Sequence, residues 1–196
     1  MFEDENNSYP SHDDIKKLPV YIKAIEISQL VRRIVEVVEK TDIKVKREVE
    51  REMIKHNLEY LTQNCLIIPA KIAGAEAVEI YDLKMENAAI IRKAAKELIT
   101  DARGLQMHGY KDTEFLDLLR EEIEAFRILF AKWVKTFDIQ NYIIDRWGLF
   151  NPPGVNYNDN DLDDDIPFNP FDFLPDELFD DDDNDDLYDG LDDEEE

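Results

Sequence analysis

Four stretches of the chain repeat apolar residues at alternating steps of three and four, and this pattern restricts the possible folds more than any other feature. Steps of three and four keep apolar side chains on one face of an α-helix, whereas a strand would need a period of two. The first stretch begins after Pro19 and continues to Val38, and the second carries its apolar face from Ile54 to Ile68. Each stretch therefore predicts an amphipathic helix.

The third and fourth predicted helices differ in the size of their apolar residues. The third runs from about Val78 to Met107 and is rich in alanine, while the fourth is rich in aromatic residues and extends to Phe137. Gly109, between them, predicts a helix C-terminal cap. Alanines that face aromatics can pack closely, and short connections favour antiparallel neighbours. We therefore expect an all-α fold, an antiparallel up-and-down four-helix bundle.

The second predicted helix contains a proline and a glycine near its end. Pro69 removes an internal hydrogen bond, and Gly74 is a poor helix former. These residues predict a joint over residues 69–76, between the second and third helices.

Acidic residues are concentrated at the C-terminal end. Residues 156–196 contain twenty Asp and Glu and no Lys or Arg, which leaves 27 acidic and 23 basic residues for the rest of a chain with a net charge of −24. Such a charge density opposes collapse into a core. The expected parts of the chain are a flexible N-terminal segment (1–17), the four-helix bundle (18–138), an apolar extension that packs on the bundle or on a neighbouring subunit (139–155) and a disordered acidic tail (156–196).

The residues that usually carry catalysis or bind metals are few and scattered. The chain has one cysteine, Cys65, which lies on an apolar helix face and is expected in the core, and three separate histidines. It has no Glu-x-x-His pair of the kind found in di-iron bundles and no phosphate-binding glycine loop. We expect no catalytic residue, no metal and no cofactor. The acidic N-terminus resembles no secretory signal and no apolar run spans a bilayer, so we expect a cytoplasmic protein with no membrane role.

Basic residues gather in two of the predicted helices, where they form stripes that could follow the phosphates of RNA or DNA. The candidate nucleic-acid-binding residues are Lys44, Lys46, Arg47, Arg51 and Lys55 at the start of the second helix, and Arg92, Lys96 and Arg103 in the third. The alternative is that these cations pair with the glutamates between them on ordinary solvated faces.

The acidic tail also contains closely spaced apolar residues. In the stretch DDDIPFNPFDFLPDELF, residues 163–179, they could dock on a partner while aspartates surround them. The candidate partner-binding residues are Ile166, Phe168, Phe171, Phe173, Leu174 and Phe179. We call residues 163–179 the acidic-aromatic segment. The alternative is a tail that only solubilises the chain.

The order of features over about residues 18–137 resembles a bacterial family of four-helix bundles. This family includes proteins encoded in ribosomal-RNA intervening sequences and Avd, the accessory variability determinant of diversity-generating retroelements. The resemblance is carried by LPVYIKA at residues 18–24, IPAKIA at 68–73, the alanine-rich third helix and LQMHGY at 105–110. LDLLREEIEAFRILFAKWV, residues 116–134, is closest to the Avd branch.

The resemblance implies a homopentamer of bacterial or phage origin with a basic surface that binds nucleic acid and docks a reverse transcriptase. From this resemblance we expect the chain to be a non-enzymatic oligomeric adaptor that assists a reverse transcriptase or a related nucleic-acid machine. The near-neutral bundle leaves an alternative open. In that alternative the protein is an interaction scaffold, in a defence or conflict system, whose tail binds a basic partner or mimics nucleic acid.

Overall fold

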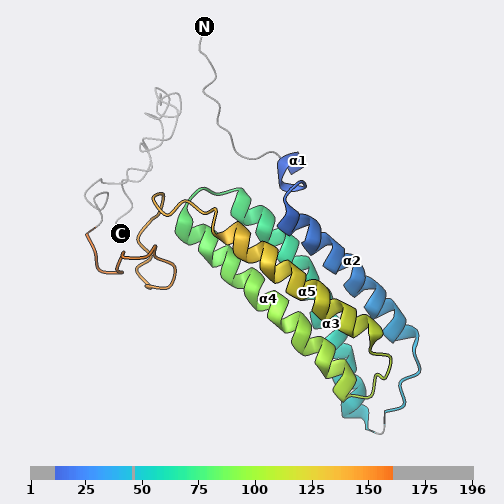
Figure 1. Cartoon of the computed structure of the whole chain (residues 1–196). Coiled ribbons are helices and arrows are strands. Elements are labelled where there is room, and N and C mark those ends of the chain that lie inside the picture. Colours follow the sequence, from blue (N-terminus) through green and yellow to red (C-terminus); the bar gives the residue numbers. More distant parts are fainter. Residues whose placement is uncertain (1–11, 46, 161–196) are drawn as a thin grey trace, which may run out of the picture. The chain divides into compact units, whose positions relative to one another are not determined.

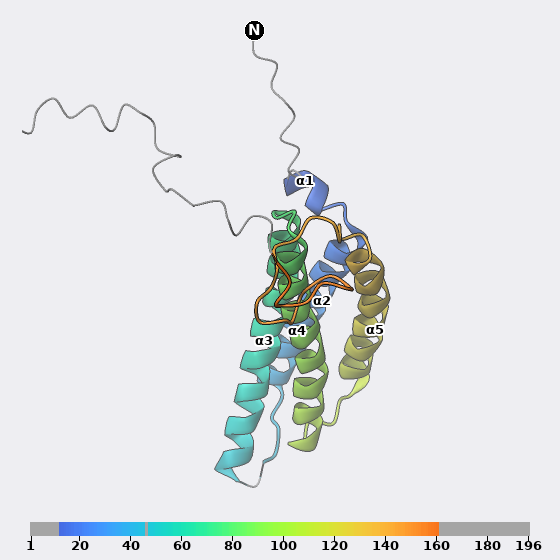
Figure 2. The ribbon, with the colours of Figure 1, turned by 90° about the vertical axis from the view of Figure 1, so that its left-hand side faces the viewer.

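The computed structural model of the chain describes residues 12–45 and 47–160, and all regular structure in these residues is α-helical (Figure 1). The helices are α1 (His12–Ile15), α2 (Pro19–Lys40), α3 (Glu48–Glu76), α4 (Tyr81–Met107) and α5 (Glu114–Val134). The four long helices lie side by side and alternate in direction, as the two ribbon views show (Figures 1 and 2). The prediction of an all-α four-helix bundle is confirmed.

The apolar faces of the four long helices meet in one core. Ile34 of α2, Leu61 of α3, Leu98 of α4 and Leu116 of α5 are all fully buried in it. Around the bundle, α2 and α4 each pack against both α3 and α5. The pair α3–α4 is the most closely packed, and α4–α5 is the least closely packed of the four pairs.

The predicted joint at residues 69–76 is wrong, because α3 continues as one helix from Glu48 to Glu76 with Pro69 inside it. A proline has no N–H to donate to the carbonyl of Cys65, four residues earlier. The hydroxyl of Ser28, which is buried in α2, lies 2.6 Å from that carbonyl oxygen and donates to it. A donor from a neighbouring helix thus replaces the bond that the proline removes.

Two contacts show how closely α3 and α4 approach. A Cβ atom on Gly104 of α4 would lie 2.5–2.8 Å from the side chain of Asn57 on α3, so only glycine fits there without a shift. Asn64 of α3, which is buried, donates to the Asp101 carboxylate of α4 at 3.5 Å. Burial is the main cause that raises the pKa of Asp101 to about 6, with a further rise from the charge of Glu97.

The end of α4 confirms the predicted role of Gly109, which has φ +100° and terminates the helix. The N–H groups of Gly109 and Tyr110 donate to the carbonyls of Gln106 and Leu105, the pattern of a Schellman cap. Other boundaries differ from the expected ones. The helix α4 begins at Tyr81 rather than Val78, and α5 ends at Val134, although Phe137 is still buried beyond it.

The N-terminal part of the described chain is more ordered than expected. Residues 12–15 form the helical turn α1, and Ile15 is buried. The expected flexible segment covers residues 1–17, and the structure shows a helical turn in its last part, at residues 12–15. Residues 1–11 lie outside the described part of the chain.

The apolar extension contacts the start of α4. The Tyr81 N–H donates to the Asn141 carbonyl at 2.7 Å, the Ile143 N–H donates to the Asp82 carboxylate at 3.0 Å, and Ile144 is buried.

Further along the extension, the carboxylate of Asp145 accepts the N–H groups of Trp147, Leu149 and Phe150 at 2.7–2.9 Å. Burial opposes the charge of Asp145, but these bonds outweigh it and lower its pKa. They hold a loop in which the Trp147 side chain is 90% exposed.

Candidate functional site

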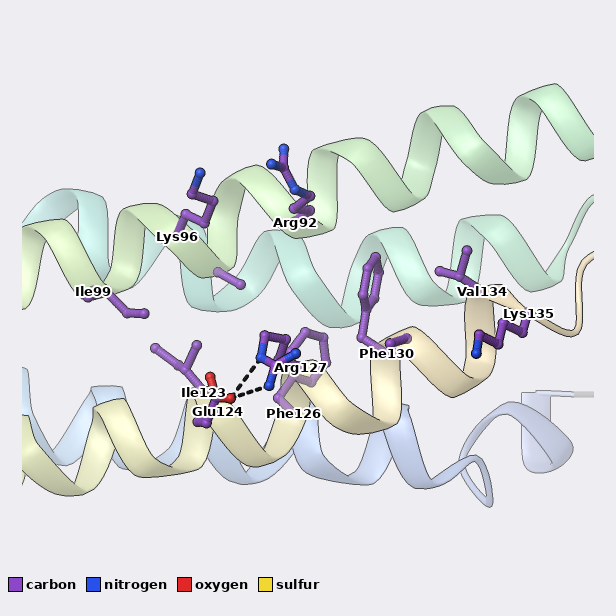
Figure 3. A pocket seen from close by; sticks show the side chains of 12 residues that line it. Arg92, Lys96, Ile99, Ile123, Glu124, Phe126, Arg127, Phe130, Val134 and Lys135 are labelled. Carbon is purple, nitrogen blue, oxygen red and sulfur yellow. Dashed lines mark hydrogen bonds and ion pairs between the residues drawn. The ribbon is translucent and has the colours of Figure 1, made fainter. Parts of the chain in front are cut away.

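A groove with a volume of about 630 Å³ lies between α4 and α5 (Figure 3). We call it the α4–α5 groove. Its volume lies within the range of ligand-binding pockets. The α4 side contributes Arg92, Ala95, Lys96 and Ile99, and the α5 side contributes Ile123, Glu124, Phe126, Arg127, Phe130, Ala131, Val134 and Lys135 at its end.

The groove exists because small and bulky residues meet without filling the space between the helices. Ala95 is buried on the α4 side, whereas Phe130 and Val134 on α5 are only partly buried. Figure 3 shows Phe130 and Val134 standing between the two helices. The expected close packing of alanines against aromatics is therefore incomplete here, and apolar surface stays open to solvent.

The α4 edge of the groove carries cations without carboxylate partners. Arg92 and Lys96 are exposed and lie one helical turn apart, and Arg103 follows at a spacing that puts it on the same face. None of the three forms an ion pair with any residue in the described ranges 12–45 and 47–160. We call these three residues the α4 row.

The opposite edge of the groove combines one ion pair with one further cation. Arg127 donates to the carboxylate of Glu124, one turn earlier, with its Nε at 2.8 Å. This bond lowers the pKa of Glu124 and raises that of Arg127. Lys135 lies just after α5 and is exposed. The groove lining thus contains four basic residues and one acidic residue, around an apolar floor.

The candidate cations at the start of α3 are mostly paired with glutamates of the same helix. Arg47 contacts Glu50 at 2.9 Å, Arg51 contacts Glu48 at 3.5 Å, and Lys55 contacts Glu59 at 3.8 Å. Lys44 is exposed in the loop before α3, and Lys46 lies outside the described residues.

The two sets of candidate cations do not form one surface. Arg51 and Lys55 border hollows that they share with Val38 and Glu39 of α2. Arg92 and Lys96 of the α4 row border the groove toward α5 instead. Because the helices follow one another around the bundle in chain order, the α2–α3 and α4–α5 grooves lie on opposite sides. A single strand of nucleic acid that lies along one side of the bundle would therefore contact only one of the two sets of cations.

Several groove residues were not among the sequence-based candidates. Arg127 and Lys135 do not belong to a run of basic residues, and each is a separate cation among the aromatic residues at the end of the fourth predicted helix. Projection of α5 on a helical wheel would have placed Arg127 next to Ile123 and Ala131. Ile99 and Phe130 are apolar residues of helices predicted to pack in a bundle, and only the tertiary structure shows that they are partly exposed.

The other expected features are placed as follows. Cys65 is buried, and burial raises the pKa of its thiol. Within the described ranges, no three His, Cys, Asp or Glu side chains gather closely enough to bind a metal ion. None of the described helices has the length and apolar character needed to span a bilayer. All candidate partner-binding residues of the acidic-aromatic segment, from Ile166 to Phe179, lie outside the described residues.

Comparison of the chain with protein-family models, with curated proteins and with solved structures gives no match.

Proposed function

We propose that this protein is a non-enzymatic oligomeric adaptor, resembling Avd, that assists a reverse transcriptase or a related nucleic-acid enzyme by binding nucleic acid and its partner protein. The observation that carries the proposal is the α4 row, whose members form no ion pair in the described residues and of which Arg92 and Lys96 line an open apolar groove. The resemblance supplies the pentameric state of this proposal, and the cytoplasmic setting follows from the sequence, whose acidic N-terminus resembles no secretory signal.

The chemistry of the α4–α5 groove suits single-stranded nucleic acid. Guanidinium and ammonium groups neutralise phosphates, and half-exposed aromatic rings offer stacking surfaces for bases. Arg92 and Lys96 supply the charges, and Phe130 supplies the ring close to them. In a ring of copies each row would repeat, so a long strand could contact several copies.

The groove residues favour binding rather than catalysis. The lining contains no His, Cys, Ser, Thr or Tyr, and its one carboxylate, Glu124, is held by Arg127. General acid–base or nucleophilic chemistry most often uses such side chains, and the two lysines of the lining, Lys96 and Lys135, are exposed. What the groove offers is a charged edge and an apolar surface.

The second candidate is an interaction scaffold whose acidic-aromatic tail binds a basic partner or mimics nucleic acid, as in a defence or conflict system. The specific observation in its favour is that Arg47, Arg51 and Lys55 are paired with glutamates, which partly neutralises the basic stripe at the start of α3. The tail carries twenty acidic residues and no basic residue.

The test measures binding of fluorescent single-stranded RNA by the full chain and by a chain that ends at Asn160. This end point retains the bonds from Arg146 to the carbonyls of Tyr157 and Asp159, and circular dichroism checks the helix content. The test variant replaces Arg92, Lys96 and Arg103 with Gln. The matched control replaces Arg47, Arg51 and Lys55 with Gln, which removes the same charge.

We expect the shorter chain to bind RNA more tightly than the full chain, with an affinity that falls as salt rises. Loss of three phosphate contacts should lower the salt slope by about 2, since each contact to a single strand contributes about 0.7. The control should change the slope less. Equal effects of the two variants would reject the α4 row as the binding site. No binding by either chain at low salt would reject the nucleic-acid role and favour the scaffold.

A further inference from the structure

The α4–α5 groove leaves apolar surface without cover in the described part of the chain. Ile99, Phe130 and Val134 are each partly buried in the helix interface and partly open to the groove. Exposed apolar surface with a polar rim is typical of docking sites for other chains. The rim here is basic, with Arg92 and Lys96 on one edge and Lys135 at the end of the other (Figure 3).

The dimensions of the groove set the length of the segment that could fill it. Along α5 the lining extends from Ile123 to Val134, which is about 17 Å at the rise of an α-helix. An extended peptide covers this distance with about five to seven residues. Its apolar side chains would have to recur every two or three residues, with carboxylates between or beside them to meet the basic rim.

One segment of the chain has this chemistry. In the acidic-aromatic segment, Phe168, Phe171 and Phe173 recur at steps of three and two, and Leu174 follows directly. The segment contains six Asp and Glu residues and no Lys or Arg. Its apolar residues match the floor of the groove, and its charge is opposite to that of the rim.

We propose that the α4–α5 groove of one copy binds the acidic-aromatic segment of a second copy of this chain. This proposal rests on the oligomeric state given in the proposed function. It identifies the contact between the groove and the segment as one that holds the copies together. Each copy brings a tail with twenty acidic residues, and these tails repel one another when copies assemble. Exchange of a terminal segment between copies is a low-cost route to assembly, and a basic groove on the neighbour reduces that repulsion.

Cross-linking of the full-length chain tests the contact. Unlabelled and ¹⁵N-labelled protein are mixed, and a carbodiimide joins carboxylates directly to nearby lysines. Lys96 and Lys135 lie at the groove, and Lys132 provides the control because it is exposed on α5 but does not line the groove. We expect mixed-isotope links from Asp172, Asp176 or Glu177 to Lys96 or Lys135, at several times the yield of links to Lys132.

Two variants separate docking in the groove from general charge attraction. The double substitution Phe171→Ser and Phe173→Ser keeps every charge of the segment and should lower the groove links several-fold. Ala131→Glu places a carboxylate at an exposed groove position and should do the same. Links of equal yield to Lys132 and Lys135, or links that the Phe variants do not change, would overturn the proposal. Links found only within one isotope would also overturn it, because the segment would then not pass to a second copy.

Sedimentation and RNA binding, measured on the same samples, keep this inference separate from the proposed function. An oligomer that binds RNA without groove links rejects the tail exchange and leaves the adaptor. A monomer that neither binds RNA nor forms mixed links rejects both.

Discussion

The helix α4 has two neighbours, α3 and α5, and its interfaces with them differ. Toward α3 the Asn57 side chain lies so close to Gly104 that a Cβ there would force it to move, and the side chains of Asn64 and Asp101 meet in a hydrogen bond. Toward α5 the helices leave a groove of about 630 Å³. The same helix therefore packs into the core on one side and borders an open groove on the other.

The size of the residues accounts for this difference. Small residues on α4 let α3 approach it closely, as they do wherever two helices pack at short distance. The α5 face is built from Phe126, Phe130 and Trp133, and Trp133 donates through its Nε1 to Glu76 at the end of α3 at 2.7 Å. This bond links the end of α5 to the end of α3.

The largest expected difference in the free energy of unfolding is between substitutions at two adjacent residues of α4. Leu98 is fully buried in the closed core, while Ile99 lines the groove and is half exposed. Leu98→Ala should lower the free energy of unfolding by about 2–5 kcal/mol, because it leaves a cavity. Ile99→Ala should cost about 1 kcal/mol, since the groove already admits solvent. Urea unfolding of both variants measures this, and equal losses would contradict the contrast between the two interfaces.

The next largest effect concerns the bond that stabilises α3 at its proline. Ser28→Ala should lower the free energy of unfolding by about 1–3 kcal/mol, because the buried Cys65 carbonyl loses the donor that replaces the missing N–H. Pro69→Ala restores that N–H, so Ser28→Ala should cost less in its presence. Chemical denaturation of the single and double variants gives the coupling. An identical cost of Ser28→Ala in both backgrounds would show that the two residues act independently.

A smaller and pH-dependent effect is expected at the closed α3–α4 interface. The folded-state pKa of Asp101 is raised from 3.8 to about 6, so the folded protein holds this proton more tightly than the unfolded chain. Protonated Asp101 therefore contributes to the stability of the folded state. This contribution is complete below about pH 4 and is lost as the pH rises through about 6. Asp101→Asn should stabilise the protein at pH 7.5 by about 1 kcal/mol, with little difference near pH 4. Thermal melts at the two pH values test this, and a gain that is the same at both would contradict it.

The smallest effect on stability is expected at the edge of the groove. Arg92→Gln and Lys96→Gln should each change the free energy of unfolding by less than about 0.5 kcal/mol, because both side chains are exposed and have no ion-pair partner in the described residues. Urea unfolding gives the value. A loss of more than 1 kcal/mol would mean that these cations stabilise the fold, and it would weaken the contrast between a core side and a binding side of α4.

Much of the fold could be predicted because it depends on local periodicity. The apolar residues of all four helices appear in the sequence at helical spacing, and the end of α4 follows from Gly109, whose positive φ suits glycine. The joint at residues 69–76 was wrong for a physical reason. Helix propensity counts the bond that Pro69 removes but not a donor from α2, and Ser28 lies 37 residues away from Cys65 in the sequence.

The candidate site was predicted only in part. The sequence shows basic residues in both α3 and α4, but it does not show which of them have partners. Arg47, Arg51 and Lys55 and the α4 row look alike as stripes, and they differ because only the first three meet glutamates at close range. Arg127 and Lys135 join the site through the packing of α5 beside α4, which no local pattern contains.

The sequence by itself determined the four amphipathic helices, the end of α4 at Gly109 and the separation of a near-neutral bundle from a strongly acidic end, because these depend on residue spacing and composition. Only the tertiary structure decided that α3 passes through Pro69, that α4 packs closely on one neighbour and loosely on the other, and that the α4 row borders an open groove. Those properties depend on how side chains from distant parts of the chain share space and hydrogen bonds, and such contacts are settled when the helices pack together.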